Sequence, residues 1–362
     1  MQRLRKKIRL LQNQRLHRIT YLPILILMPH SACNCRCVMC DIWKANARKT
    51  ELSADQLSGH LSAFQKLGVE WVILTGGEPL MHRNLWEFCR LLKRIGVRLT
   101  LLSSGLLLKP YAREIARWID EVIVSLDGSP PVHNRIRNVP EAFEKLREGI
   151  VALQQVRPQL TLLARCVVQK QNYHDLPEII KTARSLNVHR LSFVAADVSS
   201  SAYNRPVPWS GEKKSEVMLT AEEVDRLETI IEAVIQAFPH EFTTGFIAEP
   251  PEKLRRMVTY FRALLGQTAF PPVHCNAPWV SAVVEANGQV RPCFFHPPYG
   301  RISEAELPKL LNAPHAVAFR KHLRVSEHPT CQACTCSLYL DPIRPVRNWV
   351  HRLRTSPAEQ KL

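Results

Sequence analysis

Cysteine forms the most distinctive chemical pattern in this chain of 362 residues, which contains eleven cysteines. Cys33, Cys37 and Cys40 follow one another with C-x3-C-x2-C spacing, directly after a short apolar run. Three thiolates on one loop can bind three irons of a four-iron cubane, which leaves the fourth iron open to another ligand. A zinc site with Cys35 as its fourth ligand, or a redox-active cysteine pair, is the alternative that the spacing leaves open.

A glycine pair followed by an acid, Gly76-Gly77-Glu78-Pro79, lies after the next apolar run. Glycine lets the backbone approach a ligand closely, although the same residue types also form ordinary strand-to-helix turns. A cysteine loop after one run and this turn after the next make a more specific pair than either motif alone. The pair favours an iron–sulfur site over a zinc site at the cysteine loop.

A second group of cysteines lies near the C-terminal end: Cys275, Cys293, Cys331, Cys334 and Cys336. A small zinc ribbon would use cysteines in the same way, but the motifs within residues 33–79 favour iron–sulfur here as well. Cys89 and Cys166 fall on helix and strand patterns, so we predict that they are buried structural thiols.

Alternating strands and helices must position the first two motifs. Amphipathic stretches of helical length separate the apolar runs, and one is framed by Ser53 as its N-cap and Gly68 as its stop. Repeated strand–helix units predict a parallel sheet with right-handed crossovers, and six units give an open sheet or an incomplete barrel. The runs are rich in Val, Ile and Leu and predict strands at 24–28, 71–75, 98–102, 122–126, 160–168 and 189–194.

After the sixth predicted strand, the alternation of strands and helices ends. Residues 197–218 are rich in Ser, Pro and Gly and predict a linker or lid. A capping box from Thr220 to Glu223 predicts a helix that ends near Ala237, and a second helix is expected over 252–265.

Composition describes a globular protein with a strong positive charge. The 49 Lys and Arg residues exceed the 32 Asp and Glu residues, which gives a formal net charge of +17, and 46% of the residues are hydrophobic. This excludes an intrinsically disordered chain. The longest apolar run, at 21–28, is too short to cross a bilayer. Clustered thiols without a small disulfide framework predict a cytoplasmic protein.

The positive charge is concentrated at the two ends of the chain. Residues 1–19 contain seven basic residues and no acidic one, while residues 343–362 contain five basic residues and one acidic one. Leu4, Ile8 and Leu11 recur at helical spacing and predict a basic amphipathic helix. Three roles remain open for this stripe: packing on the body of the protein, contact with an anionic membrane surface, or binding of nucleic acid.

The cysteine loop followed by the Gly-Gly-Glu-Pro turn resembles the radical S-adenosylmethionine (SAM) enzymes over residues 22–195. By this resemblance, three cysteines ligate a 4Fe–4S cluster, and SAM chelates the open iron through its amino and carboxylate groups. The implied cluster ligands are Cys33, Cys37 and Cys40. The residues implied to contact the methionine amino group of SAM are Gly76, Gly77 and Glu78.

Further positions match this family less specifically. The fourth predicted strand ends in SLDG, similar to a family motif, so Ser125 and Asp127 are implied near the ribose and carboxylate of SAM; such residues also form ordinary turns. Arg165 is implied either to face the SAM carboxylate or to form a salt bridge at the barrel mouth. An H-x-x-I-R sequence that ends at Arg137 is similar to one that often follows, whereas Ser-Ser-Gly at 103–105 departs from the family's Thr-Asn-Gly.

The C-terminal cysteines are similar to the auxiliary-cluster extension called SPASM or twitch. A hairpin is predicted between strands at 279–285 and 289–291, because Asn287-Gly288 favours a tight turn. Two all-cysteine clusters would need about eight cysteines, so the five present predict one auxiliary 4Fe–4S cluster. Its implied ligands are Cys275, Cys293, Cys331 and Cys334, with Cys336 as an alternative fourth ligand.

We therefore predict an α/β protein with a partial (β/α)6 TIM-type barrel of parallel strands and a small C-terminal α+β iron–sulfur domain. The expected segments are a basic N-terminal arm, the radical SAM core, a linker with a helical segment, the auxiliary-cluster domain and a basic tail, at 1–20, 21–196, 197–268, 269–341 and 342–362.

The resemblance implies an oxidoreductase or transferase-type enzyme that reductively cleaves SAM to a 5′-deoxyadenosyl radical. This radical would take a hydrogen atom from a peptide or a metabolite of a biosynthetic pathway, and the auxiliary cluster would assist electron transfer. The implied electron donor is a low-potential protein such as flavodoxin or ferredoxin. Only 32 residues precede Cys33, so we expect no leader-peptide recognition domain ahead of the core.

Two alternatives remain open. One is a radical SAM modifier of RNA or of a lipid-linked substrate, the latter with peripheral membrane contact through the basic termini. No recognised RNA-binding module is apparent, so nucleic acid is not favoured as a partner. The other alternative is a non-enzymatic iron–sulfur or zinc protein, which the Gly-Gly-Glu-Pro turn argues against.

Overall fold

The computed structural model describes residues 2–205 and 207–341, and the predicted basic tail at 342–362 lies outside these ranges. A nine-stranded sheet runs through the molecule in the order β6-β5-β4-β3-β2-β1-β7-β8-β9. Its strands are β1 (Ile24–His30), β2 (Trp71–Gly76), β3 (Arg98–Ser103), β4 (Glu121–Ser125), β5 (Thr161–Val168), β6 (Arg190–Ala195), β7 (Ser281–Val284), β8 (Gln289–Arg291) and β9 (Gly300–Arg301).

The first six strands are parallel and lie side by side in chain order, as the sequence predicts. Each predicted strand overlaps an observed one, and the bounds differ by a few residues at most. The sheet is open, and its outer strand β6 is paired through Leu191 with residues near Ile247. This pairing satisfies part of an edge that would otherwise be exposed.

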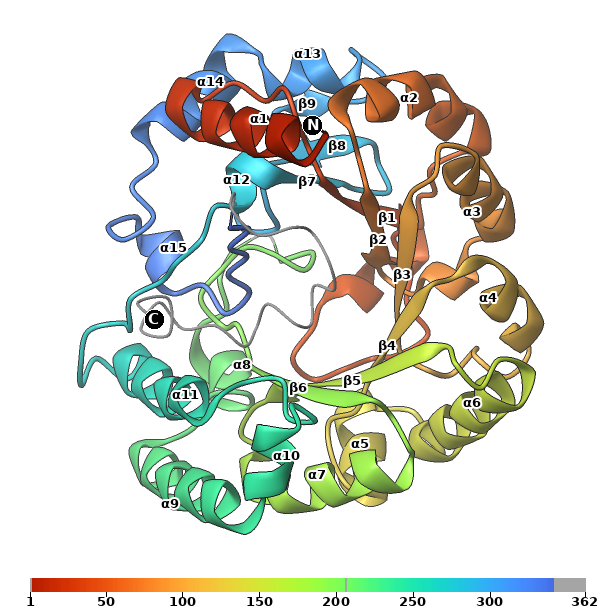
Figure 1. Cartoon of the computed structure of the whole chain (residues 1–362). Helices are drawn as coiled ribbons and strands as arrows, with labels where there is room; N and C mark the ends of the chain where they lie inside the picture. The colour runs from red at the N-terminus through yellow and green to blue at the C-terminus, as the bar shows by residue number, and fades with distance from the viewer. Residues whose placement is uncertain (1, 206, 342–362) are drawn as a thin grey trace.

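Helices cover the outside of the curved sheet (Figure 1). Those of the repeated units are α2 (Ala54–Leu67), α3 (Leu85–Arg94), α4 (Ala112–Trp118), α5 (Pro130–Arg137), α6 (Ala142–Val156) and α7 (Leu176–Ser185), with short 3-10 turns at Ile42–Arg48, Pro79–Met81 and Tyr173–Asp175. Ser53 is the N-cap of α2, as predicted, and also forms a capping box with Gln56, while Gly68 ends the helix in the left-handed region at φ +67°. The largest hydrophobic cluster lies between these helices and the strands.

After β6 the chain forms a helical segment: α8 (Gly211–Ser215), α9 (Ala221–Ala237), α10 (Pro239–Thr243) and α11 (Pro251–Leu264). The capping box from Thr220 to Glu223 is present, so the start and the end of α9 agree with the prediction. The segment at 197–218, predicted as a linker or lid, contains the short helix α8, and its described residues before α8 have no regular secondary structure.

The C-terminal part continues the same sheet. Strand β7 pairs in parallel with β1, and β8 and β9 follow as antiparallel strands. The predicted strand at 279–285 starts later than expected, because its first residues form the short helix α12 (Ala277–Val280). Three more helices complete this part: α13 (Leu307–Leu311), α14 (Pro314–His322) and α15 (Pro329–Gln332).

The basic N-terminal segment forms helix α1 (Gln2–Leu16), which packs against α12. Asn13 is fully buried; its side chain donates to the carbonyl oxygens of Tyr21 and Trp279 at 2.6 and 3.0 Å. The N-terminal helix and the C-terminal part are therefore joined by direct hydrogen bonds. Within the described residues, no helix is both long and apolar enough to span a bilayer.

Candidate functional site

The cysteine loop lies at the carboxyl end of β1, where the parallel strands β1–β6 end together. Cys33, Cys37 and Cys40 line one cavity, here called the loop cavity. Of the other residues predicted to surround SAM, five line the same cavity: Gly76, Gly77, Glu78, Ser125 and Arg165. The structure thus brings together residues that follow β1, residues at and after the end of β2, the last residue of β4, and Arg165 within β5.

Gly77 has a packing reason to be glycine. A Cβ at this position would lie 1.9 Å from the carbonyl oxygen of Ala32, which directly precedes the first loop cysteine. The backbone N–H of Glu78 donates to this same oxygen at 2.8 Å. The turn after β2 therefore supports the cysteine loop through backbone contact, which requires the missing side chain.

The Glu78 carboxylate joins the ends of β2 and β3. It is buried and accepts hydrogen bonds from the Ser103 hydroxyl at 3.0 Å and from the Ser104 N–H and hydroxyl, both at 2.7 Å. Burial raises the pKa of Glu78, although these hydrogen bonds act in the opposite direction. The serines that depart from the family's usual Thr-Asn-Gly thus hold the predicted SAM-contact acid in place.

Arg137 at the end of α5 is a site residue whose role was not predicted from its motif. It forms a buried ion pair with Asp127, and its Nη1 lies 3.6 Å from Cys37 Sγ. Burial alone would lower the pKa of Arg137, but Asp127 and the loop cysteines raise it overall. Asp127 itself does not line the loop cavity; its Oδ1 accepts from the Val167 N–H at 2.8 Å. Asp127 therefore contacts Arg137, which lines the loop cavity, but does not line this cavity itself.

Two neighbours favour the thiolate form of Cys37. A hydrogen bond from Cys35 is the largest influence, and together with the Arg137 charge it outweighs burial and lowers the pKa of Cys37 to about 7. Burial raises the pKa of Cys40 to about 12. The thiolate is the form that binds metals, so the loop contains one thiol that is ready to bind and one that a metal must deprotonate.

The segment predicted as a linker or lid closes one side of the loop cavity. Asp197 and Arg205 form a buried ion pair with 2.8 Å between Oδ2 and Nη1, and both line the cavity. The Trp209 indole N–H donates to Asp41 at 2.8 Å, and the Arg205 guanidinium lies over the Trp209 ring at 3.9 Å. These contacts fasten the segment to the residue that follows the last loop cysteine.

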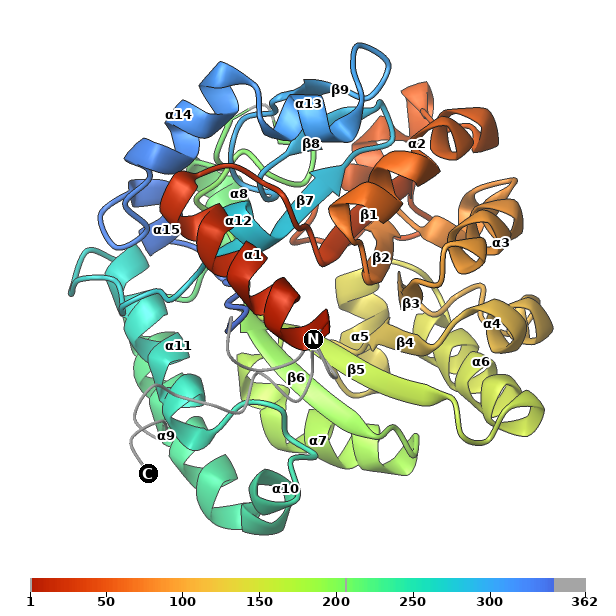
Figure 2. The same cartoon turned by 45° about the horizontal axis from the view of Figure 1, so that its top comes forward.

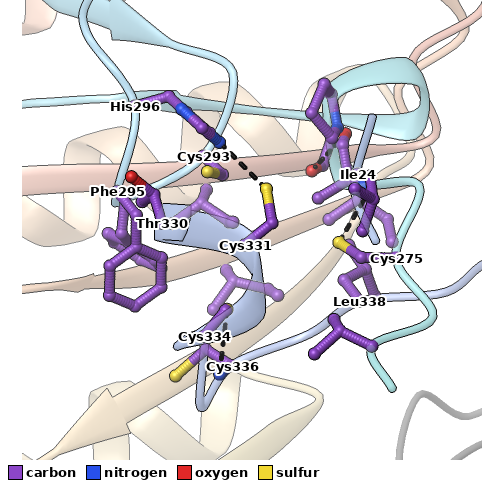
Figure 3. Close-up of a pocket in the computed structure, with 18 of the residues that line it drawn as sticks. Ile24, Cys275, Cys293, Phe295, His296, Thr330, Cys331, Cys334, Cys336 and Leu338 are labelled. Carbon is purple, nitrogen blue, oxygen red and sulfur yellow. Dashed lines mark hydrogen bonds between the residues drawn. The ribbon is translucent and has the colours of Figure 1, made fainter. Parts of the chain in front are cut away.

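The five C-terminal cysteines line a second cavity, here called the C-terminal cavity (Figure 3). Burial raises the pKa of Cys293 to about 12 and that of Cys331 to about 11, so these thiols become charged only when a metal offsets the cost. All eleven cysteines of the chain are free. Cys334 and Cys336 both line this cavity, so the choice between them as the fourth ligand stays a prediction.

His296 is a second residue that the sequence did not single out. Its Nε2 lies 3.3 Å from Cys331 Sγ (Figure 3). One ring nitrogen each of His296 and His328 and this sulfur all lie within 4.8 Å of one another. Burial lowers the pKa of His296 to about 4, so the ring is neutral near pH 7. When Cys331 is a thiolate, the ring nitrogen that faces it must be the donor.

The donor sets suit iron–sulfur clusters. The loop cavity offers three cysteines, which would bind three irons of a cubane, and the C-terminal cavity offers a set of five cysteines. The two cavities also meet, because four residues line both of them: Thr75, Leu102, Arg165 and Cys336.

Comparison with known families agrees with this arrangement. The profile described as Radical SAM superfamily matches residues 27–183, and the profile described as SPASM, iron-sulfur cluster-binding domain, matches residues 275–335. The fold and the site thus define a radical SAM domain with a C-terminal SPASM domain. These two domains imply that the protein binds SAM with a 4Fe–4S cluster and holds auxiliary iron–sulfur.

Three curated relatives have different activities. The AdoMet-dependent heme synthase of Methanosarcina barkeri is 28% identical over 220 residues, which cover 56% of this chain and 62% of that protein. The probable GTP 3',8-cyclase of Sulfolobus acidocaldarius is 32% identical, covering 45% and 52%. The PqqA peptide cyclase of Rhizobium meliloti is 25% identical, covering 68% and 60%. The chain thus spans less than two thirds of each relative's length.

Two solved structures share the fold. Streptococcus suis SuiB bound to precursor peptide SuiA superposes with a TM-score of 0.62 at 14% identity, covering 93% of this chain and 76% of that chain. Native anSMEcpe with bound AdoMet gives a TM-score of 0.62 at 18% identity and covers 86% of each chain. At these identities the likeness concerns the fold.

Proposed function

We propose that the protein abstracts a hydrogen atom from an apolar part of a peptide, held where the loop cavity meets the C-terminal cavity. The observation that carries this proposal is the shared lining by Thr75, Leu102, Arg165 and Cys336. A substrate at this junction would lie between the two cysteine sets. When bound and reduced, the cluster supplies the electron that cleaves SAM into methionine and a 5′-deoxyadenosyl radical.

In this proposal, the residues of the chain bind the clusters, orient SAM and the substrate, and exclude water from them. Cys33, Cys37 and Cys40 hold the first cluster, and Arg137 stabilises the Cys37 thiolate. Arg165 supplies a positive charge at the junction, where it pairs with the SAM carboxylate or an acidic group of the substrate. Cysteines of the C-terminal cavity would hold the auxiliary cluster, which would supply a site that accepts or relays an electron.

The character of the lining supports an apolar reacting group. Most side chains around the C-terminal cavity, other than the cysteines, are aliphatic or aromatic, among them Ile26, Ile73, Phe294 and Leu338. Such walls exclude water and favour a hydrocarbon side chain over a nucleotide. A peptide substrate also agrees with two of the matches, because one relative is a PqqA peptide cyclase and one structure holds a precursor peptide.

A tetrapyrrole is the second candidate substrate. Apolar walls with one arginine suit a flat apolar ring that carries carboxylates, and curated relatives include a heme synthase and an Fe-coproporphyrin III synthase. The two candidates differ in a direct observable. Coproporphyrin binding would change its visible absorption spectrum, whereas a peptide substrate would leave added coproporphyrin unbound.

The test uses protein reconstituted with iron and sulfide without oxygen. We expect about eight irons per chain, and slow release of 5′-deoxyadenosine from SAM after reduction. A peptide panel with deuterated Leu, Val or Phe side chains should move deuterium into 5′-deoxyadenosine. Transfer from deuterated coproporphyrin instead would select the second candidate.

Cysteine variants separate the two clusters. Changing Cys33, Cys37 and Cys40 together to Ala should remove roughly half of the iron and abolish SAM cleavage, since each cluster holds about four irons. Cys331→Ala with Cys334→Ala should keep the first cluster and SAM cleavage. Cys89→Ala is the matched control, because this buried thiol lies outside both cavities. Intact clusters without SAM cleavage under several reductants would refute the proposal.

A further inference from the structure

The predicted apolar stripe of helix α1 faces outward. Leu4, Ile8 and Leu11 are 62%, 45% and 52% exposed, and Leu16 at the helix end is 58% exposed. The described part of the chain contains nine large hydrophobic residues with comparable exposure, and these four belong to one helix. Packing of the stripe on the body, one of the three roles left open by the sequence, is therefore wrong.

Another face of the helix attaches it to the protein. Leu10 is buried in a cluster with Tyr21, Trp279 and Val280, and the buried Asn13 side chain accepts from the Thr20 N–H at 2.8 Å. The attachment fixes which side of α1 points away from the body. Figure 2 shows α1 crossing the front of the molecule.

Basic side chains flank the outward apolar stripe. Arg5 and Arg15 are exposed and Lys7 is half-buried, and within the described residues none of the three forms an ion pair. Lys6 differs, because its ammonium lies 2.7 Å from the Glu70 carboxylate. The face thus combines exposed aliphatic carbon with unneutralised positive charge.

We propose that this face of α1 binds an anionic membrane surface and holds the enzyme there peripherally. Aliphatic side chains with flanking Lys and Arg are the composition of helices that lie in the interface plane of a bilayer. Phosphate headgroups of anionic lipid complement the charge, while the acyl region receives the stripe. RNA would contact only the basic side chains and leave the apolar stripe exposed to water. A membrane would contact both the basic side chains and the stripe, so it fits this face better.

The test is co-sedimentation of the full chain with vesicles of phosphatidylcholine alone and with about one third phosphatidylserine. We expect binding to the anionic vesicles only, and release as KCl rises from about 0.1 to 0.5 M, because added salt shortens the range of the attraction. Ile8→Gln with Leu11→Gln should weaken binding about tenfold or more.

A matched control pair lies on α6. Val151 and Val156 are 45% and 46% exposed, much like Ile8 and Leu11, so Val151→Gln with Val156→Gln should bind like the unchanged protein. Iron content and thermal unfolding of both variants check that the fold is kept.

Three results would overturn the proposal: equal vesicle binding by the two paired variants, tight binding of an RNA oligonucleotide that the α1 variant retains, or a dimer that this variant converts to a monomer without change in vesicle binding. Release of 5′-deoxyadenosine in the absence of vesicles does not depend on this face, so the outcome is independent of the proposed chemistry.

Discussion

Gly77 shows how a single missing Cβ supports the site. Gly77→Ala would place a methyl group against the Ala32 carbonyl, so the cysteine loop or the turn after β2 must shift. We expect a loss of about 2 kcal/mol or more in the free energy of unfolding, as for overpacked sites, and less iron bound at the loop. Iron analysis and denaturant unfolding measure both effects.

The control is Gly59→Ala on α2, where a Cβ meets nothing within 4 Å. Alanine is the better helix former by roughly 0.5–1 kcal/mol, so this variant should be slightly more stable. If Gly77→Ala binds iron and unfolds like Gly59→Ala, the proposed close packing is incorrect.

His296 permits a prediction about the auxiliary cluster. A hydrogen bond to a ligating sulfur stabilises the reduced, more negative cluster, so its removal lowers the reduction potential. His296→Phe removes the donor at Cys331, and a loss of about 1 kcal/mol corresponds to a decrease on the order of 40 mV for one electron. Potentiometric titration followed by electron paramagnetic resonance measures the shift.

His296→Gln keeps an N–H donor and should retain most of the potential. Equal potentials for His296→Phe and the unchanged protein would show that the 3.3 Å contact does not act on the cluster. The potential of the first cluster serves as an internal reference, because His296 lines only the C-terminal cavity of the two.

The sequence predicted the cysteines of both sets and the turn after β2, because these depend on residue type and spacing within one loop. It did not assign roles to Arg137 or His296. Arg137 reaches Cys37 from 100 positions along the chain, and His296 reaches Cys331 from 35. Such contacts depend on how elements pack, and a single sequence does not contain that information.

At the scale of elements, helix α5 supports the cysteine loop from behind. The loop N–H groups of Arg36 and Val38 donate to the carbonyl oxygens of Arg137 and Ile136 at 3.1 and 3.2 Å. The Arg137 side chain adds the buried ion pair with Asp127. The backbone and the side chain of one helix end thus fix the same loop.

Arg137→Met should be strongly destabilising, because it leaves the Asp127 carboxylate buried without a positive partner. The expected loss in the free energy of unfolding is roughly 3–5 kcal/mol. Adding Asp127→Asn removes the uncompensated charge, so the double variant should regain part of the loss. Denaturant unfolding of the two variants measures the difference.

An exposed pair provides the control. Arg255 and Glu232 form a surface ion pair at 2.6 Å, so Arg255→Met should leave the free energy of unfolding nearly unchanged. A single Arg137→Met variant no less stable than the double variant would contradict the role assigned to the buried pair.

Helix boundaries show the same division between local and long-range information. The starts of α2 and α9 were predictable, because a capping box is encoded within four residues. The outward face of α1 was not, because its attachment is made by Leu10 and Asn13, and the partners of Asn13 include the distant Trp279. The apolar stripe alone left open whether it packs on the body of the protein or faces outward.

At the scale of the whole molecule, the six parallel strands were predictable from apolar runs, but the continuation of the sheet was not. Strand β7 pairs with β1 in register from Ile24 with Ser281 to Leu27 with Val284. The Asn287-Gly288 turn predicts that β7 and β8 are neighbours, but it does not predict that β7 pairs with the distant strand β1. The pairing places the C-terminal cysteines beside the barrel and makes the two cavities meet.

This shared sheet predicts that the C-terminal part and the barrel unfold together. Because β1 lies between β2 and β7, its hydrogen bonds cannot open independently of either neighbour. In hydrogen exchange followed by mass spectrometry, amides of β7 should be protected to within about 1 kcal/mol of those of β1.

The exposed helix α8, which buries none of its side chains, should exchange rapidly and sets the lower reference. Exchange in β7 more than about 100-fold faster than in β1, equivalent to about 2.7 kcal/mol, would mean that the SPASM domain opens by itself. The C-terminal cavity would then be held together by its cluster and not by the common sheet.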